Sequence, residues 1–248
     1  MEKQHHIGLL PGDVAETVFL PGDVGRAEII ASLFDEADFV AQNRQYVTYS
    51  GSYKGVPVSV TSTGIGCPAL AIAVEELIKV GGRNFIRIGT CGALQKYIKL
   101  GDVIIATAAV RGDGTSREYF PLEYPAIADF HLLECLIQAA HNLDVKPHIG
   151  IVRAHDAFYA ESVLAKGDYL ALDKPWIESN VLSTENESST LFTLATVRKC
   201  RGGTILTPVG HHLFPEEVIS NDDVHSSILL ETKIALEAAV IFANKNLQ

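Results

Sequence analysis

The chain has few cysteines, and their spacing suits neither a disulfide framework nor a zinc site. Its 248 residues include four cysteines that stand far apart, at Cys67, Cys91, Cys135 and Cys200. No CxxC pair occurs, and no cluster of cysteine and histidine has the spacing of a structural zinc site. We therefore expect reduced thiols, a reducing compartment and no bound metal.

Long hydrophobic runs and a targeting signal are also absent. No apolar run approaches the roughly 18 residues that suggest a membrane span. The first residues, MEKQHHIGLLPGD, have neither the basic nor the apolar segment of a signal peptide. We expect a soluble, cytoplasmic protein.

Positive charge is scarce. The chain has 20 Lys and Arg against 30 Asp and Glu, a formal net charge of −10. Such a balance works against non-specific binding to nucleic acid, whose phosphate backbone needs clustered basic residues. A small ligand is favoured over a polymer, and a few local arginines are still enough to bind an anionic one.

The sequence does contain a large hydrophobic fraction, 47%, arranged as alternating strand and helix patterns. It has no internal repeat and no linker, so we expect one domain, 1–248. The predicted strands are 17–23, 56–64, 84–92, 101–110, 148–154 and 202–210, and the predicted helices are 25–34, 67–80, 129–142, 185–199 and about 224–246. This alternation predicts an α/β fold with a largely parallel or mixed sheet, helices on both faces, and ligands at the carboxyl ends of strands.

Arg87 stands between two isoleucines in a predicted buried strand, NFIRIG. A buried guanidinium without a partner costs several kcal/mol, so Arg87 needs a carboxylate, carbonyl groups or a bound anion. A structural ion pair, with Glu75 or Glu76 as candidates, and an anion site both satisfy this need. The small residues after it, Gly89 to Gly92, favour the anion site because they can offer backbone N–H groups and a hydroxyl.

Other glycine-containing turns repeat this theme more weakly. Gly22 ends a strand, and Arg26 lies in the first turn of the next helix, where N–H groups favour an anion. A tight turn with a solvated arginine explains the same pattern. STGIG before Cys67 is similar, but no GxGxxG follows, so a dinucleotide fold is not supported.

Thr184 and Glu187 have the spacing of a capping box at the start of the predicted helix 185–199. In the alternative interpretation, Glu187 points into the cleft and accepts hydrogen bonds from a sugar diol, because a carboxylate takes two hydroxyl donors at once.

Aromatic and histidine side chains suggest a base site less directly. Phe158 and Tyr159 follow a strand and are placed to stack on a planar base or to pack in the core. Trp176 is expected in the core. His211 and His212 are adjacent, so they point apart in an extended segment and do not share a metal.

Together these segments resemble the nucleoside phosphorylase-I superfamily, which includes the purine and uridine phosphorylases, and are most similar to its uridine phosphorylase branch. The similarity covers nearly the whole chain, and its most specific parts are RIGTCGALQ and AAVRGDG…PLEYPA. The other matching segments are HIGL, LPGDVGR, NRQY, STGIGCP, DAFY and TENESSTLF.

The resemblance implies a single α/β domain whose mixed sheet closes partly into a barrel. It also implies a homohexamer, a trimer of dimers, with active sites shared between the subunits of each dimer. The substrates would be a nucleoside and inorganic phosphate, with no cofactor and no metal. Phosphorolysis would yield the free base and ribose (or deoxyribose) 1-phosphate, reversibly.

By position, the resemblance also assigns the site residues. The phosphate ligands would be Gly22, Arg26, Arg87 and Thr90, with Arg44 from the neighbouring subunit. The ribose ligands would be Thr90, Asn186 and Glu187, with His6 of the neighbour near the 5′ hydroxyl. The base would be flanked by Cys91, Gly92, Phe158 and Thr184.

Both usual base-recognition signatures are missing. Ser162 and Leu164 replace the Gln and Arg that hold uracil in uridine phosphorylases, while Val209 and Gly210 stand where purine phosphorylases carry an Asp. The sequence therefore does not decide between a pyrimidine and a purine base, or between ribose and deoxyribose as the sugar. We count Arg87 and Glu187 as catalytic candidates. His211 and His212 are further candidates, and one of them would donate a hydrogen bond to the base.

Two other functions compete with a phosphorylase. A nucleosidase of the same superfamily would use water, but it has less use for Arg26, Arg44 and Arg87 around one oxyanion. A catalytically weak nucleoside-binding protein would account for the altered base residues, but not for the complete phosphate and ribose set.

Overall fold

In the computed structural model, which describes residues 2–160, 164 and 167–245, one mixed sheet runs through the molecule. Along the sheet the strands follow the order β10-β6-β8-β9-β5-β1-β4-β3-β2, and β7 pairs with β6. Their bounds are β1 Thr17–Pro21, β2 Glu36–Asn43, β3 Tyr46–Tyr53, β4 Val56–Thr61, β5 Asn84–Ala93, β6 Ile104–Gly112, β7 Ala126–Ile127, β8 His148–His155, β9 Ser183–Glu185 and β10 Arg201–His211.

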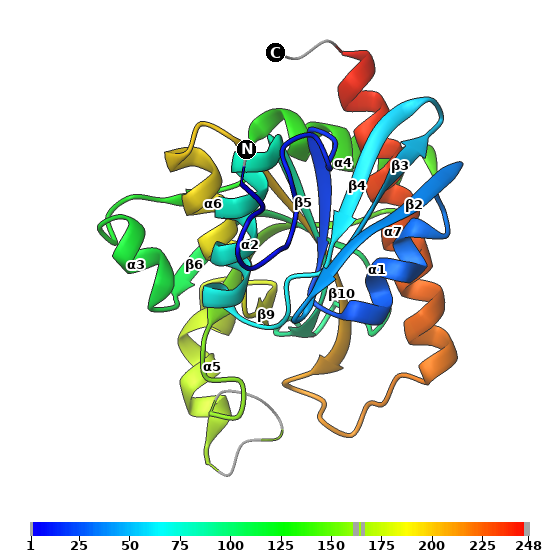
Figure 1. Cartoon of the computed structure of the whole chain (residues 1–248). Coiled ribbons are helices and arrows are strands. Elements are labelled where there is room, and N and C mark those ends of the chain that lie inside the picture. The colour runs from blue at the N-terminus through cyan, green and yellow to red at the C-terminus, as the bar shows by residue number, and fades with distance from the viewer. Residues whose placement is uncertain (1, 161–163, 165–166, 246–248) are drawn as a thin grey trace.

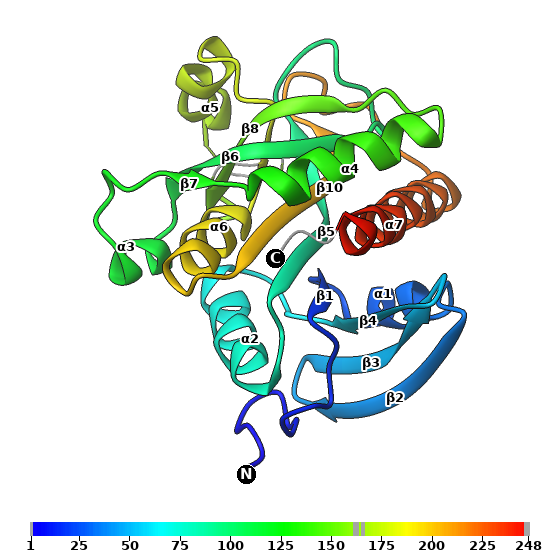
Figure 2. The same ribbon diagram turned by 90° about the horizontal axis from the view of Figure 1, so that it is seen from above.

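One end of the sheet closes on itself. β10 pairs with β5 as well as with β6, so β10, β6, β8, β9 and β5 form a five-stranded ring, visible from above in Figure 2. This confirms the predicted mixed, partly barrel-closed sheet.

Helices cover both faces of this sheet, as expected. Their bounds are α1 Val24–Ala31, α2 Cys67–Val80, α3 Thr115–Tyr119, α4 Phe130–Asn142, α5 Tyr169–Glu178, α6 Ser188–Val197 and α7 Asn221–Asn244. α4 packs against α7 on one side and α2 against α6 on the other (Figure 2). Each pair covers its own apolar cluster, one around Leu77 and Phe192 and the other around Leu136 and Ala239.

Local signals explain the helix starts that the sequence predicted well. Asp129 caps α4 by accepting hydrogen bonds from the N–H groups of His131 and Leu132. α2 begins after Gly66, which has a φ of 95°, with Pro68 in its first turn, and ends at Gly81.

The predicted capping box is wrong, and so is the predicted start of its helix. The chain is still extended at Glu185 in β9, and α6 begins only at Ser188. Glu185 accepts hydrogen bonds from the N–H groups of Glu187 and Ser188, which leaves the Glu187 carboxylate for other contacts. Thr184 pairs with Gly92 across the strands.

Six elements were not predicted: the strands β2 and β3 of one hairpin, the short strands β7 and β9, and the helices α3 and α5. β2 is largely exposed, and α5 has a proline in its interior and a single buried residue, so neither shows a clear apolar pattern. Trp176 of α5 is only partly buried, and the Arg153 guanidinium lies over its ring, 4.8 Å from the centroid.

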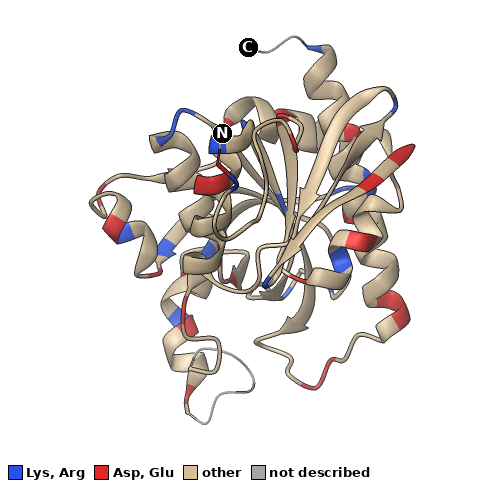
Figure 3. Cartoon of the chain, in the orientation of Figure 1, with Lys and Arg blue, Asp and Glu red and all other residues tan. Residues whose placement is uncertain are grey.

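The carboxyl ends of the parallel strands β1, β5 and β10 meet at one edge of the sheet. α5 and the segment after β10 lie at this same end, the lower one in Figure 1. Acidic and basic residues are interspersed over the helices and strands (Figure 3). None of the helices in the described ranges is long and apolar enough to cross a membrane.

Candidate functional site

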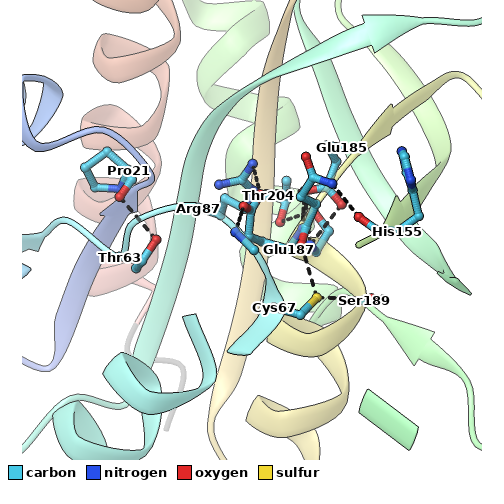
Figure 4. A network of polar contacts seen from close by, with 12 residues as sticks. Pro21, Thr63, Cys67, Arg87, His155, Glu185, Glu187, Ser189 and Thr204 are labelled. Atoms are coloured by element: carbon cyan, nitrogen blue, oxygen red, sulfur yellow. Dashed lines mark hydrogen bonds and ion pairs between the residues drawn. The ribbon is translucent and has the colours of Figure 1, made fainter. Parts of the chain in front are cut away.

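Arg87 lies at the centre of a buried polar network between β5, β9 and the start of α6 (Figure 4). Its Nε is 3.0 Å from Glu185 Oε2, and its Nη2 is 2.5 Å from Glu187 Oε2. All three side chains are buried. The carboxylate partners are therefore Glu185 and Glu187, whereas Glu75 pairs with Arg198 and Glu76 with His6.

The two carboxylates decide the charge state of this network. Burial alone would lower the pKa of Arg87, but the negative charges of Glu187 and Glu185 outweigh it and raise that pKa. Burial raises the pKa of Glu185, which the positive charge of Arg87 opposes. Glu187 is also held by the N–H of Gly66, 2.5 Å from its Oε1.

The third nitrogen of the guanidinium, Nη1, faces a glycine-lined turn. A Cβ at Gly22 would lie 3.2 Å from the Gly64 carbonyl oxygen and 4.0 Å from Arg87 Nη1. A Cβ at Gly89 would come within 2.7 Å of Arg87 Nη2. Gly89 therefore lies directly against the guanidinium, whereas a side chain at Gly22 would first meet the Gly64 carbonyl oxygen.

Arg26, in the first turn of α1, adds a second positive charge beside Arg87. Burial lowers the pKa of Arg26, and the charge of Arg87 lowers it further, while Glu231 opposes both. Asp23 caps α1 by accepting a hydrogen bond from the backbone N–H of Arg26. The end of β1 therefore has two arginines and a helix N-terminus side by side, a combination that attracts an anion.

Glu231 of α7 lies beneath this site and was missed from the sequence, where it is one glutamate on a helix with many. Its side chain is fully buried, Oε2 accepts a hydrogen bond from Thr207 at 2.9 Å, and no partner for Oε1 exists among the described residues. Burial raises the pKa of Glu231 to about 8. Thr207 pairs across the strands with Thr90, so Glu231 lies behind the end of β5.

The end of β5 also presents Thr90, Cys91 and Gly92. Thr90 is partly exposed, and Cys91 is buried. Burial raises the pKa of Cys91 to about 12 and that of Cys67 still higher, so neither thiol is prepared to act as a nucleophile.

The two adjacent histidines at the end of β10 point apart, as predicted. His211 accepts a hydrogen bond from the N–H of Leu213 at Nδ1, and its Nε2 lies 3.2 Å from the Gln95 carbonyl oxygen. His212 turns the other way, with Nδ1 bonded to Asp173 of α5. In the part of the chain that the structure describes, no group of three His, Cys, Asp or Glu side chains is placed to hold a metal ion.

Asn186 and Thr184 lie close to this network. Asn186 donates a hydrogen bond through Nδ2 to the carbonyl oxygen of His155. Thr184 is buried beside Gly92, and the structure shows no partner for its Oγ1 within the described ranges.

Three residues assigned from the resemblance, His6, Arg44 and Phe158, form no hydrogen bond or ion pair with Arg87 in the described part of a single chain. His6 bonds Glu76 through Nδ1 at 2.7 Å, and Arg44 is exposed at the β2–β3 turn with a φ of 55°. Phe158 is 47% exposed, and Leu164 is exposed. Ser162 lies outside the described residues.

Comparison with known proteins decides the family. A model of the phosphorylase superfamily matches residues 16–228. The chain belongs to this superfamily.

Similar proteins of this superfamily include uridine phosphorylases and a guanosine phosphorylase. The uridine phosphorylase of Thermococcus kodakarensis is 47% identical over 82% of this chain and 75% of its own. The guanosine phosphorylase of Halorubrum lacusprofundi is 44% identical over 85% of both chains. The crystal structure of uridine phosphorylase from Vibrio fischeri is similar to this one with a TM-score of 0.90 and 35% identity, over 97% of this chain and 98% of that one.

Proposed function

We propose that this protein, as one phosphorylase domain spanning 1–248, is a nucleoside phosphorylase, a pentosyltransferase of the uridine phosphorylase type. It cleaves the N-glycosidic bond of a nucleoside with inorganic phosphate, reversibly, without a metal or organic cofactor. The observation that carries the proposal is the meeting of Arg87, Arg26 and Glu187 at one strand edge. Relatives named uridine phosphorylase support it.

Phosphate binds between the two arginines in this proposal. Arg87 Nη1 faces Gly22, and Arg26 lies in the first turn of α1, so guanidinium groups and backbone N–H groups converge on one small volume. Thr90, three residues after Arg87 on β5, is the hydroxyl ligand in this proposal. An oxyanion held there is fixed relative to the sugar, which turns a bimolecular attack into a nearly intramolecular one.

Glu187 holds the ribose. Its carboxylate lies beside Arg87 and faces the Gly66 N–H, and a carboxylate accepts hydrogen bonds from two neighbouring hydroxyls. Arg87 thus anchors Glu187 and keeps Nη1 for phosphate, so the ion pair and the anion site coexist. Asn186, next in the chain, supports the same end of the sugar.

The proposed reaction depends on the charges that develop on the sugar and the base as the glycosidic bond breaks. As the glycosidic bond lengthens, the sugar becomes cationic and the base gains negative charge, while phosphate attacks from the opposite face. Cys91, Gly92, Phe158 and Thr184 flank the base in this proposal. Hydrogen bonds to the base stabilise its departure.

Other subunits complete the site. His6 and Arg44 have no contact with Arg87 within the described residues, and Asn43 ties the two segments together by donating to the carbonyl oxygen of His6. We place both residues in the active site of a neighbouring subunit, in a cytoplasmic hexamer. Apolar side chains such as Ile127, Ile149 and Ile151 are exposed, which supports association between copies.

A purine substrate is the second candidate, because one relative is named guanosine phosphorylase. The test incubates the protein with uridine, thymidine, inosine, guanosine, adenosine and methylthioadenosine, with and without phosphate, and measures free base and sugar 1-phosphate. We expect base release only with phosphate, with one sugar phosphate formed per base. Release that ignores phosphate indicates a nucleosidase, and no release indicates a nucleoside-binding protein.

A further inference from the structure

His212 is fixed at the end of β10 in a single orientation. Its backbone N–H donates to the Ala93 carbonyl oxygen at 3.0 Å, and its imidazole is buried, 4% exposed. Nδ1 is hydrogen-bonded to Asp173 Oδ2. Because a carboxylate oxygen only accepts, Nδ1 carries the proton of this bond, and Nε2 points the opposite way.

Asp173 is an unusual residue for its helix. It is fully buried, whereas the rest of α5 is partly or fully exposed. Its Oδ1 has no partner among the residues described, so His212 is the group that compensates this carboxylate. Removing both partners from water costs about as much free energy as their attraction returns. Stability alone therefore does not explain the His212–Asp173 pair.

Nε2 of His212 faces the end of β5. A Cβ at Gly92 would stand 2.6 Å from Nε2 and 3.5 Å from Thr184 Cγ2, so these three residues surround one spot. Within the described ranges, the imidazole makes its one hydrogen bond through Nδ1 and none through Nε2. Thr184 Oγ1 is buried there without a partner as well. Buried polar atoms are nearly always hydrogen-bonded, so the unpartnered Thr184 Oγ1, with His212 Nε2 beside the same glycine, indicates a ligand with polar edges.

This spot lies two residues beyond Thr90 on the same strand, next to the proposed phosphate and ribose sites. Resting on the proposed function, we propose that His212 donates a hydrogen bond from Nε2 to an oxo group of the departing base. Asp173 is its positioning residue, and it stabilises the positive charge of the imidazole when both ring nitrogens are protonated. The substrates are nucleosides of uracil or a 6-oxopurine, and adenosine and cytidine are poor ones.

The step balances without any other reactant. The C1′–N bond breaks and its electron pair goes to the base, while an oxygen of hydrogen phosphate forms the new bond to C1′. The negative charge of the base spreads onto its oxo oxygen, where it accepts the hydrogen bond from Nε2. The proton that phosphate loses on forming the ester equals the one that the free base takes up.

The test compares His212→Ala, His212→Gln and Asp173→Asn with the wild type at saturating phosphate, using uridine, inosine, cytidine and adenosine. The matched control is His148→Gln, because His148 forms another His–Asp pair, with Asp102 at 2.9 Å, at the start of β8. Circular dichroism and melting temperatures show which variants fold. Calorimetry measures the binding of free uracil and hypoxanthine to each protein.

We expect His212→Ala to lower kcat for the favoured oxo nucleoside about 100-fold, the usual scale for losing one donor to a developing charge. The KM for phosphate and the slow cleavage of adenosine and cytidine stay unchanged. His212→Gln, whose amide nitrogen can stand near the Nε2 position, recovers part of the loss. Asp173→Asn lowers kcat in the same selective way, and His148→Gln matches the wild type.

Equal losses for oxo and amino nucleosides, or a His212→Ala variant as active as His148→Gln, would overturn this inference while leaving the phosphorylase proposal intact. A wild type that releases no base with phosphate would overturn that proposal instead. The calorimetric binding of uracil and hypoxanthine would then test the role of His212. If His212→Ala leaves the affinity for these bases unchanged, or if the wild type does not bind them, the proposed hydrogen bond from His212 is wrong.

Discussion

The Arg87 guanidinium and the Glu185 carboxylate meet at 3.0 Å although 98 residues separate them in the chain. Their contact joins β5 to β9 inside the closed part of the sheet. Glu185 also caps α6, and Arg87 also holds Glu187. One buried ion pair therefore fixes the start of a helix and the carboxylate that we assign to ribose.

Substitutions of Arg87 test this arrangement first. Arg87→Ala leaves Glu185 buried and uncompensated, so we expect the free energy of unfolding to fall by about 3–5 kcal/mol in urea titrations. Arg87→Lys keeps the charge but loses the planar fork, so it folds and its KM for phosphate rises about 10-fold or more. Arg83→Lys, on the surface, is the control. An unchanged KM in Arg87→Lys would contradict a phosphate role.

Gly89 tests how closely the backbone must approach the guanidinium. In Gly89→Ala, the new Cβ would lie 2.7 Å from Nη2, which Glu187 holds in place. We expect the guanidinium to shift and kcat/KM for phosphate to fall at least about 10-fold, with a smaller loss of melting temperature. Gly210→Ala is the control because nothing lies within 4 Å of its Cβ. Equal behaviour of the two variants would disprove the steric argument.

Glu187 is tested by removing its hydroxyl partners. Glu187→Gln should lower kcat/KM for the preferred ribonucleoside about 10–100-fold, the range for a hydrogen bond to a charged group. The same variant should cleave the corresponding 2′,3′-dideoxynucleoside nearly as well as the wild type does. Glu178→Gln, on the exposed face of α5, serves as control. An equal loss with both nucleosides would mean that Glu187 acts only through Arg87.

The raised pKa of the Glu231 carboxyl group predicts that the stability of the protein depends on pH. Its pKa is about 8 in the folded protein against an ordinary value near 4.5, so between these values the folded chain keeps a proton that the unfolded chain has lost. The free energy of unfolding must then fall as pH rises from about 4.5 to about 8. In Glu231→Gln this component is absent. The melting temperature of the variant minus that of the wild type should rise across this range and then level off.

The control for this pH series is Glu28→Gln, on the exposed face of α1, whose difference from the wild type should stay flat. A constant difference for Glu231→Gln as well would show that the carboxyl group is ionised throughout.

Much of the fold could be predicted because its signals are local. The bounds of α2 follow from Gly66, Pro68 and Gly81, and the buried strands β5 and β10 from continuous apolar residues. The missed elements lack such signals. β2 and α5 are mostly exposed, so their side chains carry no apolar period.

The sequence by itself determined six of the ten strands, most helices and the family resemblance, and it showed that Arg87 needed a partner. Only the tertiary structure decided which partner. Glu75 and Glu76 are near Arg87 in the chain, but α2 turns them toward Arg198 and His6, and ring closure brings Glu185 and Glu187 instead. Asp173 likewise meets His212 only because α5 folds over the end of β10. Local patterns encode elements, whereas such pairings depend on contacts between residues far apart in the chain.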